Sequence, residues 1–163
     1  MKRLTHRALV VAAATSLALA LGGCHGAAQQ AAMPSDGEMT KMANDTVAAW
    51  TSMDAAKIKA IYAPNVVAFD FVAAPLETDR PTFDKAQDAF AAAKLNNAEQ
   101  VSRTLQPLDP DTFVMSGAWN ISSSSVPANK AAVRCTDVFH KDAAGAWPIV
   151  NEHCSAVPQA AAA

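Results

Sequence analysis

The chain has 163 residues, of which 51% are hydrophobic and 17% charged, and its formal net charge is −2. This length suits a single domain with one core. An acidic chain lacks the basic surface that nucleic acids require, so we expect no nucleic-acid partner.

Residues 1–23 have the pattern of an export signal, in which three basic residues precede an apolar run over 8–21. Residues 21–24 read Leu-Gly-Gly-Cys and resemble a bacterial lipobox. The resemblance implies cleavage before Cys24 and its lipidation, which would anchor the protein to a membrane. His25, where some lipoproteins carry aspartate, resembles the signal for the outer rather than the inner membrane. The alternative is an ordinary secretory signal with a chance cysteine.

After removal of residues 1–23, 10 basic residues face 15 acidic ones, so the net charge becomes −5. Residues 24–35 are rich in Ala, Gln and Gly without periodicity, which predicts a flexible tether. Residues 158–163 predict a disordered tail. The folded domain is therefore expected over residues 36–157, facing the periplasm.

Two helices are predicted before residue 64. Apolar residues at three- and four-residue spacing predict the first from Asp36, with Ser35 or Asp36 as its N-cap. Asp54 caps a second, shorter helix, and Pro64 ends it because the residue before a proline disfavours helix. The residues expected to face the core are Met39, Met42, Ala43, Val47, Trp50 and Met53 in the first helix, and Ile58, Ile61 and Tyr62 in the second.

A β-rich run then predicts a strand over 66–71 and a short return strand over 73–76. Thr78 or Asp79 caps a third helix, which the asparagines at 96–97 are expected to end. Its buried stripe comprises Phe83, Ala86, Phe90 and Ala93.

Beyond residue 97 the apolar period changes from 3.6 to 2, which indicates strands. Strands are predicted over 101–106 and 113–121, joined by an Asp-Pro-Asp turn. The serine-rich stretch 122–129 predicts a loop, and 133–157 a β-hairpin with a glycine in its connection. This order predicts an α+β fold, a curved mixed or antiparallel sheet with three helices on its concave face.

The order and three segments resemble the nuclear transport factor 2-like superfamily, also called the SnoaL-like or ketosteroid-isomerase-like cone. The segments are W-T-S-M-D to I-Y-A-P over 50–64 with the following strand, R-C-T-D-V-F over 134–139, and W-P-I-V-N-E-H-C-S over 147–155. The resemblance covers about residues 39–157 and implies the cone fold. Members include isomerases, cyclases, dehydratases, small-molecule binders and assembly modules, so the fold does not imply one function.

Two features differ from the enzymes of this superfamily. Glu-Thr-Asp-Arg at 77–80 stands where members often have a glycine before the third helix. Tyr62 is the only tyrosine, and no motif gives it a carboxylate partner. The tyrosine-plus-two-aspartate set of steroid isomerases therefore cannot be placed from the sequence.

Strand alternation sorts the hairpin into two faces. If Cys135 lies opposite Cys154, the face that carries His153 also carries Trp147 and Ile149. Because these two apolar residues need burial, we expect that face to be concave and the cysteines to point the other way. The pocket candidates are Arg134, Thr136, Asn151 and His153 from the hairpin, together with Tyr62, Asp70 and Trp119.

His153 or Asp70 is the candidate general acid or base. The alternative makes His153 and Arg134 buried polar groups satisfied by their neighbours, and Asp70 a hydrogen-bonded residue at a strand end. His140 lies about 13 Å from His153 at ~3.3 Å per strand residue, too far to share a metal. We expect no metal and no cofactor.

Cys135 and Cys154 form an even pair in an exported chain, which predicts a disulfide. Directly opposite residues of antiparallel strands have Cβ atoms about 4.5–5.5 Å apart, close enough to be joined. The alternative is two buried thiols.

Three functions remain open from the sequence. The first is an envelope-anchored cone domain that binds a small, partly apolar molecule or acts as an accessory module. The second is an isomerase, cyclase or dehydratase that uses His153 or Asp70. The third is a non-catalytic homodimer formed through the open face of the sheet, where Trp119 is a candidate contact. An enclosed cavity of about 300 Å³ or more would favour binding or catalysis.

Overall fold

The computed structural model describes residues 31–69, 76, 79–93, 95–123 and 126–157. At 95–97, 123 and 126–131 it describes the backbone alone. The described residues form three helices and five strands. The chain from Ala31 onward forms one compact unit. Predictions for residues 1–30, Asp70, the return strand up to residue 75 and the tail lie outside the described residues. None of the described helices combines the length and the hydrophobicity needed to cross a membrane. The elements are α1 (Asp36–Thr51), α2 (Ala55–Ala60), β1 (Tyr62–Phe69), α3 (Arg80–Ala92), β2 (Leu95–Asp109), β3 (Thr112–Ser123), β4 (Val126–His140) and β5 (Ile149–Ala156).

The three helices begin at the capping residues that the sequence predicts. The Ser35 hydroxyl accepts the Glu38 N–H at 3.2 Å, and the Glu38 carboxylate accepts the Ser35 N–H at 2.9 Å, which completes a capping box. Asp54 caps α2, and Asp79 caps α3 by accepting the Thr82 N–H at 3.0 Å.

Three predicted boundaries are wrong, and each error shortens or omits a strand. Helix α2 ends at Ala60, because the chain from Tyr62 already pairs with β5. The asparagines at 96–97 belong to β2 rather than to a helix end. Most of the serine-rich stretch 122–129 belongs to β3 and β4, which pair as far as Ser123 and Val126. Cross-strand hydrogen bonds override the local turn preference in all three places.

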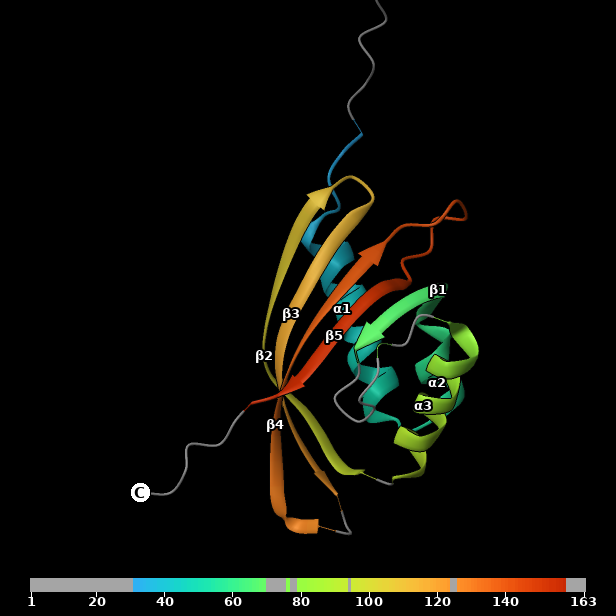
Figure 1. Ribbon diagram of the computed structural model, residues 1–163. Helices are drawn as coiled ribbons and strands as arrows, with labels where there is room; N and C mark the ends of the chain where they lie inside the picture. Colours follow the sequence, from blue (N-terminus) through green and yellow to red (C-terminus); the bar gives the residue numbers. More distant parts are fainter. Residues whose placement is uncertain (1–30, 70–75, 77–78, 94, 124–125, 158–163) are drawn as a thin grey trace, which may run out of the picture. The chain divides into compact units, whose positions relative to one another are not determined.

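The five strands form one mixed sheet in the order β1-β5-β4-β3-β2. Strands β1 and β5 run parallel and the other neighbours antiparallel. The helices cover one face of the curved sheet (Figure 1). The predicted α+β architecture, with three helices against a curved mixed sheet, is confirmed.

The core lies between the helices and this face of the sheet. Phe113 and Phe139 stack with ring centroids 4.4 Å apart, and Trp50 meets Phe90 edge-on at 4.8 Å. The largest fully buried apolar side chains are Phe83, Phe90, Phe113, Phe139, Met39, Ile58, Met115, Ile149 and Val66.

A β-bulge at Val150 determines which side chains of β5 face the core. Phe139 pairs with Ile149 while the next residue back, Val138, pairs with Asn151, so Val150 has no partner on β4. An extra residue reverses the alternation of faces beyond it. Ile149 and Glu152 are therefore both buried, although their numbers differ in parity.

Candidate functional site

Two acidic side chains lie against each other inside the cone. Asp137 on β4 and Glu152 on β5 are cross-strand partners, and their exposed fractions are 4% and 1%. The Tyr62 hydroxyl donates a hydrogen bond of 2.5 Å to Oε2 of Glu152. Among the described residues, Oδ1 of Asp137 has no hydrogen-bond partner. Together, Tyr62, Asp137 and Glu152 form a buried group that can hold and pass on a proton.

Burial controls the protonation of this group. It raises the pKa of Asp137 from its ordinary value of 3.8 to about 7, because a carboxylate loses its hydration among apolar side chains. A hydrogen bond with the Glu152 carboxyl opposes this rise in the pKa. Because the two carboxyl groups are cross-strand neighbours in a buried site, a negative charge on one disfavours a negative charge on the other.

The cavity beside the acid pair is nearly filled by the protein. Its free volume is about 10 Å³, which is the space of about one water. This is far below the 300 Å³ expected of a ligand-sized enclosure. The lining residues are Trp50, Ala98, Trp119, Ile121, Cys135, Asp137 and Glu152.

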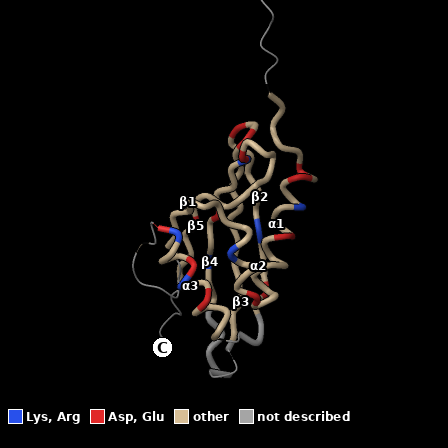
Figure 2. The backbone as a smooth tube through the Cα atoms, turned by 90° about the vertical axis from the view of Figure 1, so that its right-hand side faces the viewer, with Lys and Arg blue, Asp and Glu red and all other residues tan. Residues whose placement is uncertain are grey.

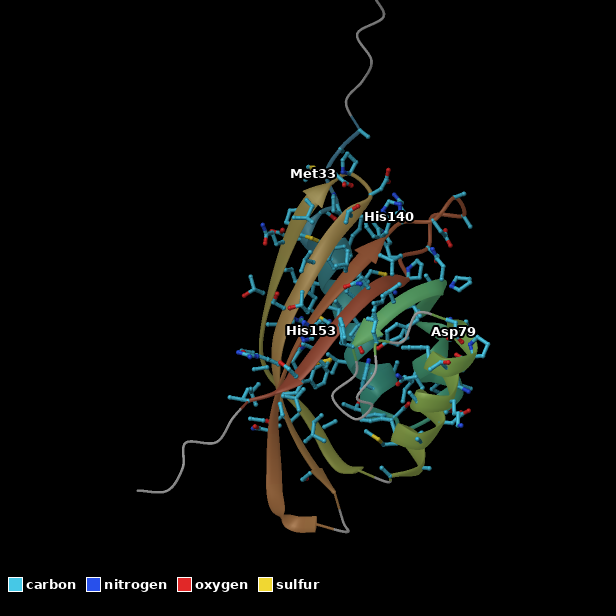
Figure 3. All side chains as sticks on the ribbon, in the orientation of Figure 1. Met33, Asp79, His140 and His153 are labelled. Atoms are coloured by element: carbon cyan, nitrogen blue, oxygen red, sulfur yellow. A yellow bond between two sulfur atoms is a disulfide. The ribbon has the colours of Figure 1, made fainter. Side chains whose placement is uncertain are left out.

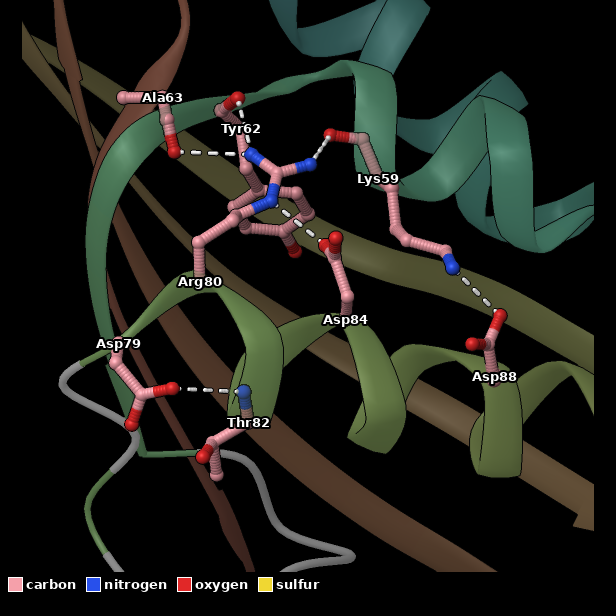
Figure 4. A network of polar contacts seen from close by, with 8 residues as sticks. All are labelled: Lys59, Tyr62, Ala63, Asp79, Arg80, Thr82, Asp84 and Asp88. Carbon is pink, nitrogen blue, oxygen red and sulfur yellow. Dashed lines mark hydrogen bonds and ion pairs between the residues drawn. The ribbon is translucent and has the colours of Figure 1, made fainter.

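An arginine network fixes the backbone that carries Tyr62 (Figure 4). The Arg80 guanidinium donates to the carbonyl oxygens of Tyr62 at 3.1 Å, Ala63 at 3.0 Å and Lys59 at 2.8 Å. Its Nε pairs with Asp84 one turn along α3 at 2.6 Å. Arg80 thereby joins α3 to the junction of α2 and β1, where the Tyr62 side chain begins its path to Glu152.

A larger recess lies between α1, the start of β1 and the connection from β4 to β5. We call it the α1–loop recess, and its free volume is about 350 Å³. Tyr62 belongs to both sites, because it lines this recess and its hydroxyl contacts Glu152 of the inner cavity. The other lining residues are Met42, Asp45, Thr46, Ala60, Ile61, Pro64, Phe139, Asp142, Ala146, Trp147 and Pro148.

The predicted concave position of His153, Arg134, Thr136 and Asn151 is wrong. All four side chains are exposed and lie on the face of the sheet away from the helices. The bulge at Val150 is the reason, because the burial of Ile149 does not extend to the residues two and four positions further on.

On that outer face, three of these residues line an open depression of about 460 Å³, namely Arg134, Thr136 and His153. Nε of Arg134 donates to the Ser155 hydroxyl at 3.0 Å. Phe69 packs on His153 with ring centroids 5.5 Å apart. His140 lies at the end of β4, well along the sheet from His153 (Figure 3). In the described part of the chain, no three His, Cys, Asp or Glu side chains are arranged to hold a metal.

The predicted disulfide between Cys135 and Cys154 is confirmed. The two residues are cross-strand partners with Cα atoms 4.1 Å apart, and their sulfur atoms are bonded. They lie on the helix-facing side, two residues from Asp137 and Glu152 along their strands. The disulfide therefore joins the two strands that hold the acid pair.

Sequence reasoning missed Asp137 and Glu152. The signal was present on β4, where Cys135, Asp137 and Phe139 alternate with exposed residues, and Phe139 requires burial. Deriving the buried face from Phe139 instead of Trp147 and Ile149 would have placed the acid pair inside. Of the other candidates, Trp119 lines the inner cavity and Tyr62 the recess.

The structure is similar to several solved structures. A domain from Xanthomonas campestris, provisionally described as a calcium/calmodulin dependent protein kinase II association domain, is 27% identical over 80% of this chain and 96% of its own, with a TM-score of 0.66. A protein provisionally described as a ketosteroid isomerase, from Parabacteroides distasonis, is 14% identical over 74% and 86%, with a TM-score of 0.61. One provisionally described as a dehydratase of the nuclear transport factor 2-like family, from Streptomyces avermitilis, is 18% identical over 75% and 96%, with a TM-score of 0.62.

The chain has the nuclear transport factor 2-like fold. No protein-family model and no curated protein matches its sequence. The resemblance noted in the sequence is thus confirmed at the level of the fold. Within this fold, the inner cavity holds the acid pair, and the α1–loop recess and the outer depression offer more space.

Proposed function

We propose that this protein is an envelope-anchored binding module that takes a small, partly apolar molecule in the α1–loop recess. The observation that carries the proposal is the combination of volume and lining. The recess has about 350 Å³ and aromatic and aliphatic walls, whereas the inner cavity has about 10 Å³ and the outer depression of about 460 Å³ is lined mostly by polar and small side chains. Small-molecule sites usually have about 300–1,000 Å³ and are lined by apolar and aromatic side chains with few polar groups. Met42, Ile61 and Trp147 supply such a lining.

Filling the recess tests this function. Ala60 lines the recess and is exposed, so Ala60→Phe should occupy its space without disturbing the core. Ala56→Phe places the same side chain at an exposed position of the same helix away from the recess. Ligand-observed NMR with a library of small amphipathic compounds should give binders for the wild type and for Ala56→Phe, and these should lose most of their signal with Ala60→Phe. Equal binding to both variants, or no binder for the wild type, would contradict the proposal.

The anchor is part of the same proposal. Residues 1–23 would direct export, and lipidated Cys24 would hold the domain at the outer membrane, facing the periplasm. The disulfide supports an oxidising compartment, because such bonds persist there and are rare in the cytosol. Metabolic labelling with a radioactive fatty acid should mark the wild type and leave Cys24→Ser unlabelled. Equal labelling of the two proteins would exclude lipidation at this residue.

A second candidate function is proton transfer of the isomerase or dehydratase kind at Asp137, Glu152 and Tyr62. The raised pKa of Asp137 favours it, since an acid-base catalyst works best when its pKa lies near the working pH. The catalytic group would then be this trio rather than His153, which faces the other side of the sheet. A substrate would need movement of Trp50 or Trp119, because both line the filled cavity.

Deuterium exchange tests this second candidate. Mass spectrometry of a panel of cyclic ketones incubated with the protein in D₂O should detect label at the carbon beside the carbonyl, and Asp137→Asn should abolish it. Trp50→Ala, which enlarges the cavity, should increase the rate. Exchange no faster than in buffer, for both the wild type and the enlarged variant, would rule out this reaction.

A further inference from the structure

We propose that the α1–loop recess selects an organic cation, an alkylammonium group with a short apolar tail, over neutral and anionic molecules that carry the same tail. This inference rests on the proposed binding function and adds the class of ligand. It is drawn from the charges and the aromatic ring around the recess.

The charges on the wall are negative. Asp45 enters from α1 and Asp142 from the connection between β4 and β5, and none of the described residues lining the recess is Lys or Arg. Helix α1 carries three acidic residues and one basic residue, and Asp45 follows Lys41 by one turn (Figure 2). Lys41 pairs with Asp45 at 2.6 Å, but both side chains are more than half exposed. Such an exposed ion pair contributes little to stability, so a bound cation can take the place of Lys41 beside Asp45.

The second carboxylate is held rigidly. Oδ1 of Asp142 accepts the N–H groups of Ala144 and Ala146, each at 2.9 Å. Gly145, with φ of 83°, allows the chain to turn tightly between them. The carboxylate is therefore fixed in place by the loop, whereas the carboxylate of Asp45 is free to exchange its partner.

An aromatic ring in the same wall already carries a cation. Nζ of Lys141 lies 5.4 Å from the ring centroid of Trp147. Phe113 packs edge-on against that ring at 5.3 Å and fixes its orientation. Tryptophan is the best side chain for binding a cation over its face. Lys141 itself does not line the recess, but its charge over the same ring would compete with a ligand ammonium bound there.

The remaining wall suits an apolar tail. Met42, Ile61, Phe139 and Pro148 contribute carbon surface, and the volume of about 350 Å³ accommodates a short alkyl chain beside the head group. A small ammonium compound can thus place its charge near Asp45, Asp142 and Trp147 and its tail against these side chains.

Three probes with one tail test the selection on the full-length protein. Hexyltrimethylammonium, hexanol and hexanoate should bind in that order by ligand-observed NMR titration. Asp45→Asn should weaken the binding of the cation by about two- to fivefold, as expected for one exposed charge interaction, and leave the affinity for hexanol unchanged. Asp36→Asn is the matched control on the same helix, because Asp36 is exposed and does not line the recess.

Lys141→Ala provides the opposite test. Removing the Lys141 ammonium should increase the affinity for hexyltrimethylammonium by about two- to fivefold, because the face of the Trp147 ring becomes free. Hexanol bound as tightly as the cation, or hexanoate bound more tightly, would overturn the charge selection and leave the binding function intact. Failure of all three probes to bind would contradict the binding function as well.

Discussion

At the scale of single residues, Asp137 makes the stability of the protein depend on pH. Its pKa is raised from 3.8 to about 7 in the folded state, so between these values the folded protein binds the proton more tightly than the unfolded chain does. The free energy of unfolding should therefore fall as the pH rises through this window, by up to about 1.4 kcal/mol per pH unit. Asp137→Asn should flatten this dependence, because the amide does not ionise.

Urea unfolding of both proteins at half-unit steps from pH 4 to pH 8 measures this difference. Asp109→Asn is a suitable control, because Asp109 is exposed at the end of β2. A pH dependence that survives in Asp137→Asn would show that another group causes it.

Tyr62→Phe removes one hydroxyl from the same buried group. The Glu152 oxygen that accepts it at 2.5 Å loses this donor, and a lost hydrogen bond to a buried carboxyl costs about 1–3 kcal/mol. The ring should stay in place, because it packs on Phe83 with centroids 4.6 Å apart. In a double-mutant cycle, Tyr62→Phe should cost much less in the background of Glu152→Leu, because leucine offers no acceptor to the hydroxyl. Equal costs in both backgrounds would mean that the hydroxyl does not act through Glu152.

At the scale of elements, the disulfide stabilises the hairpin of β4 and β5. The two cysteines are 19 residues apart, and a loop of this size contributes about 3 kcal/mol in the chain-entropy account. Replacing both by alanine should lower the free energy of unfolding by roughly that amount. Reductant should destabilise the wild type by a similar amount and leave the double variant unaffected. A double variant as stable as the oxidised wild type would contradict this role.

The elements also show what the sequence predicts and what it does not. Helix starts are predictable because capping is local, and Ser35, Asp54 and Asp79 are all correct. The faces of the hairpin are predictable only up to the bulge at Val150, since nothing in its composition marks an extra residue. The acid pair was missed because its face was derived from Trp147 and Ile149, which lie before the bulge, and not from Phe139 on β4. The start of β1 at Tyr62 was missed because its partner Ile149 is far along the chain.

The bulge itself can be tested by deletion. Removing Val150 should turn the bulge into a regular ladder in which Asn151 follows Ile149 directly, so Glu152 stays opposite Asp137 and within reach of Tyr62. The variant should therefore still unfold cooperatively by circular dichroism. Deleting Ala144 from the exposed connection is the control for the loss of one residue. Loss of cooperative unfolding in the Val150 deletion alone would show that the extra residue is needed for this register.

At the scale of the whole molecule, the two faces of the sheet have separate properties. The helix-covered face holds the disulfide, the acid pair and the core, while the outer face is open and carries Arg134 and His153. The homodimer expected from the sequence remains a prediction for that outer face. Binding at the α1–loop recess does not require it, because the recess is formed by α1, β1 and the β4–β5 connection of one chain.

The compact unit from Ala31 contains all the described helices and strands, so we expect it to fold without residues 1–30. A protein comprising residues 31–163 should unfold cooperatively at the same temperature as Cys24→Ser, since neither protein carries lipid. Both should bind the same compounds in the recess. Calorimetry and the NMR titration measure these two properties. A lower unfolding temperature for the shorter protein would mean that residues 1–30 contribute to the fold, whereas equal temperatures with lost binding would place part of the binding site in those residues.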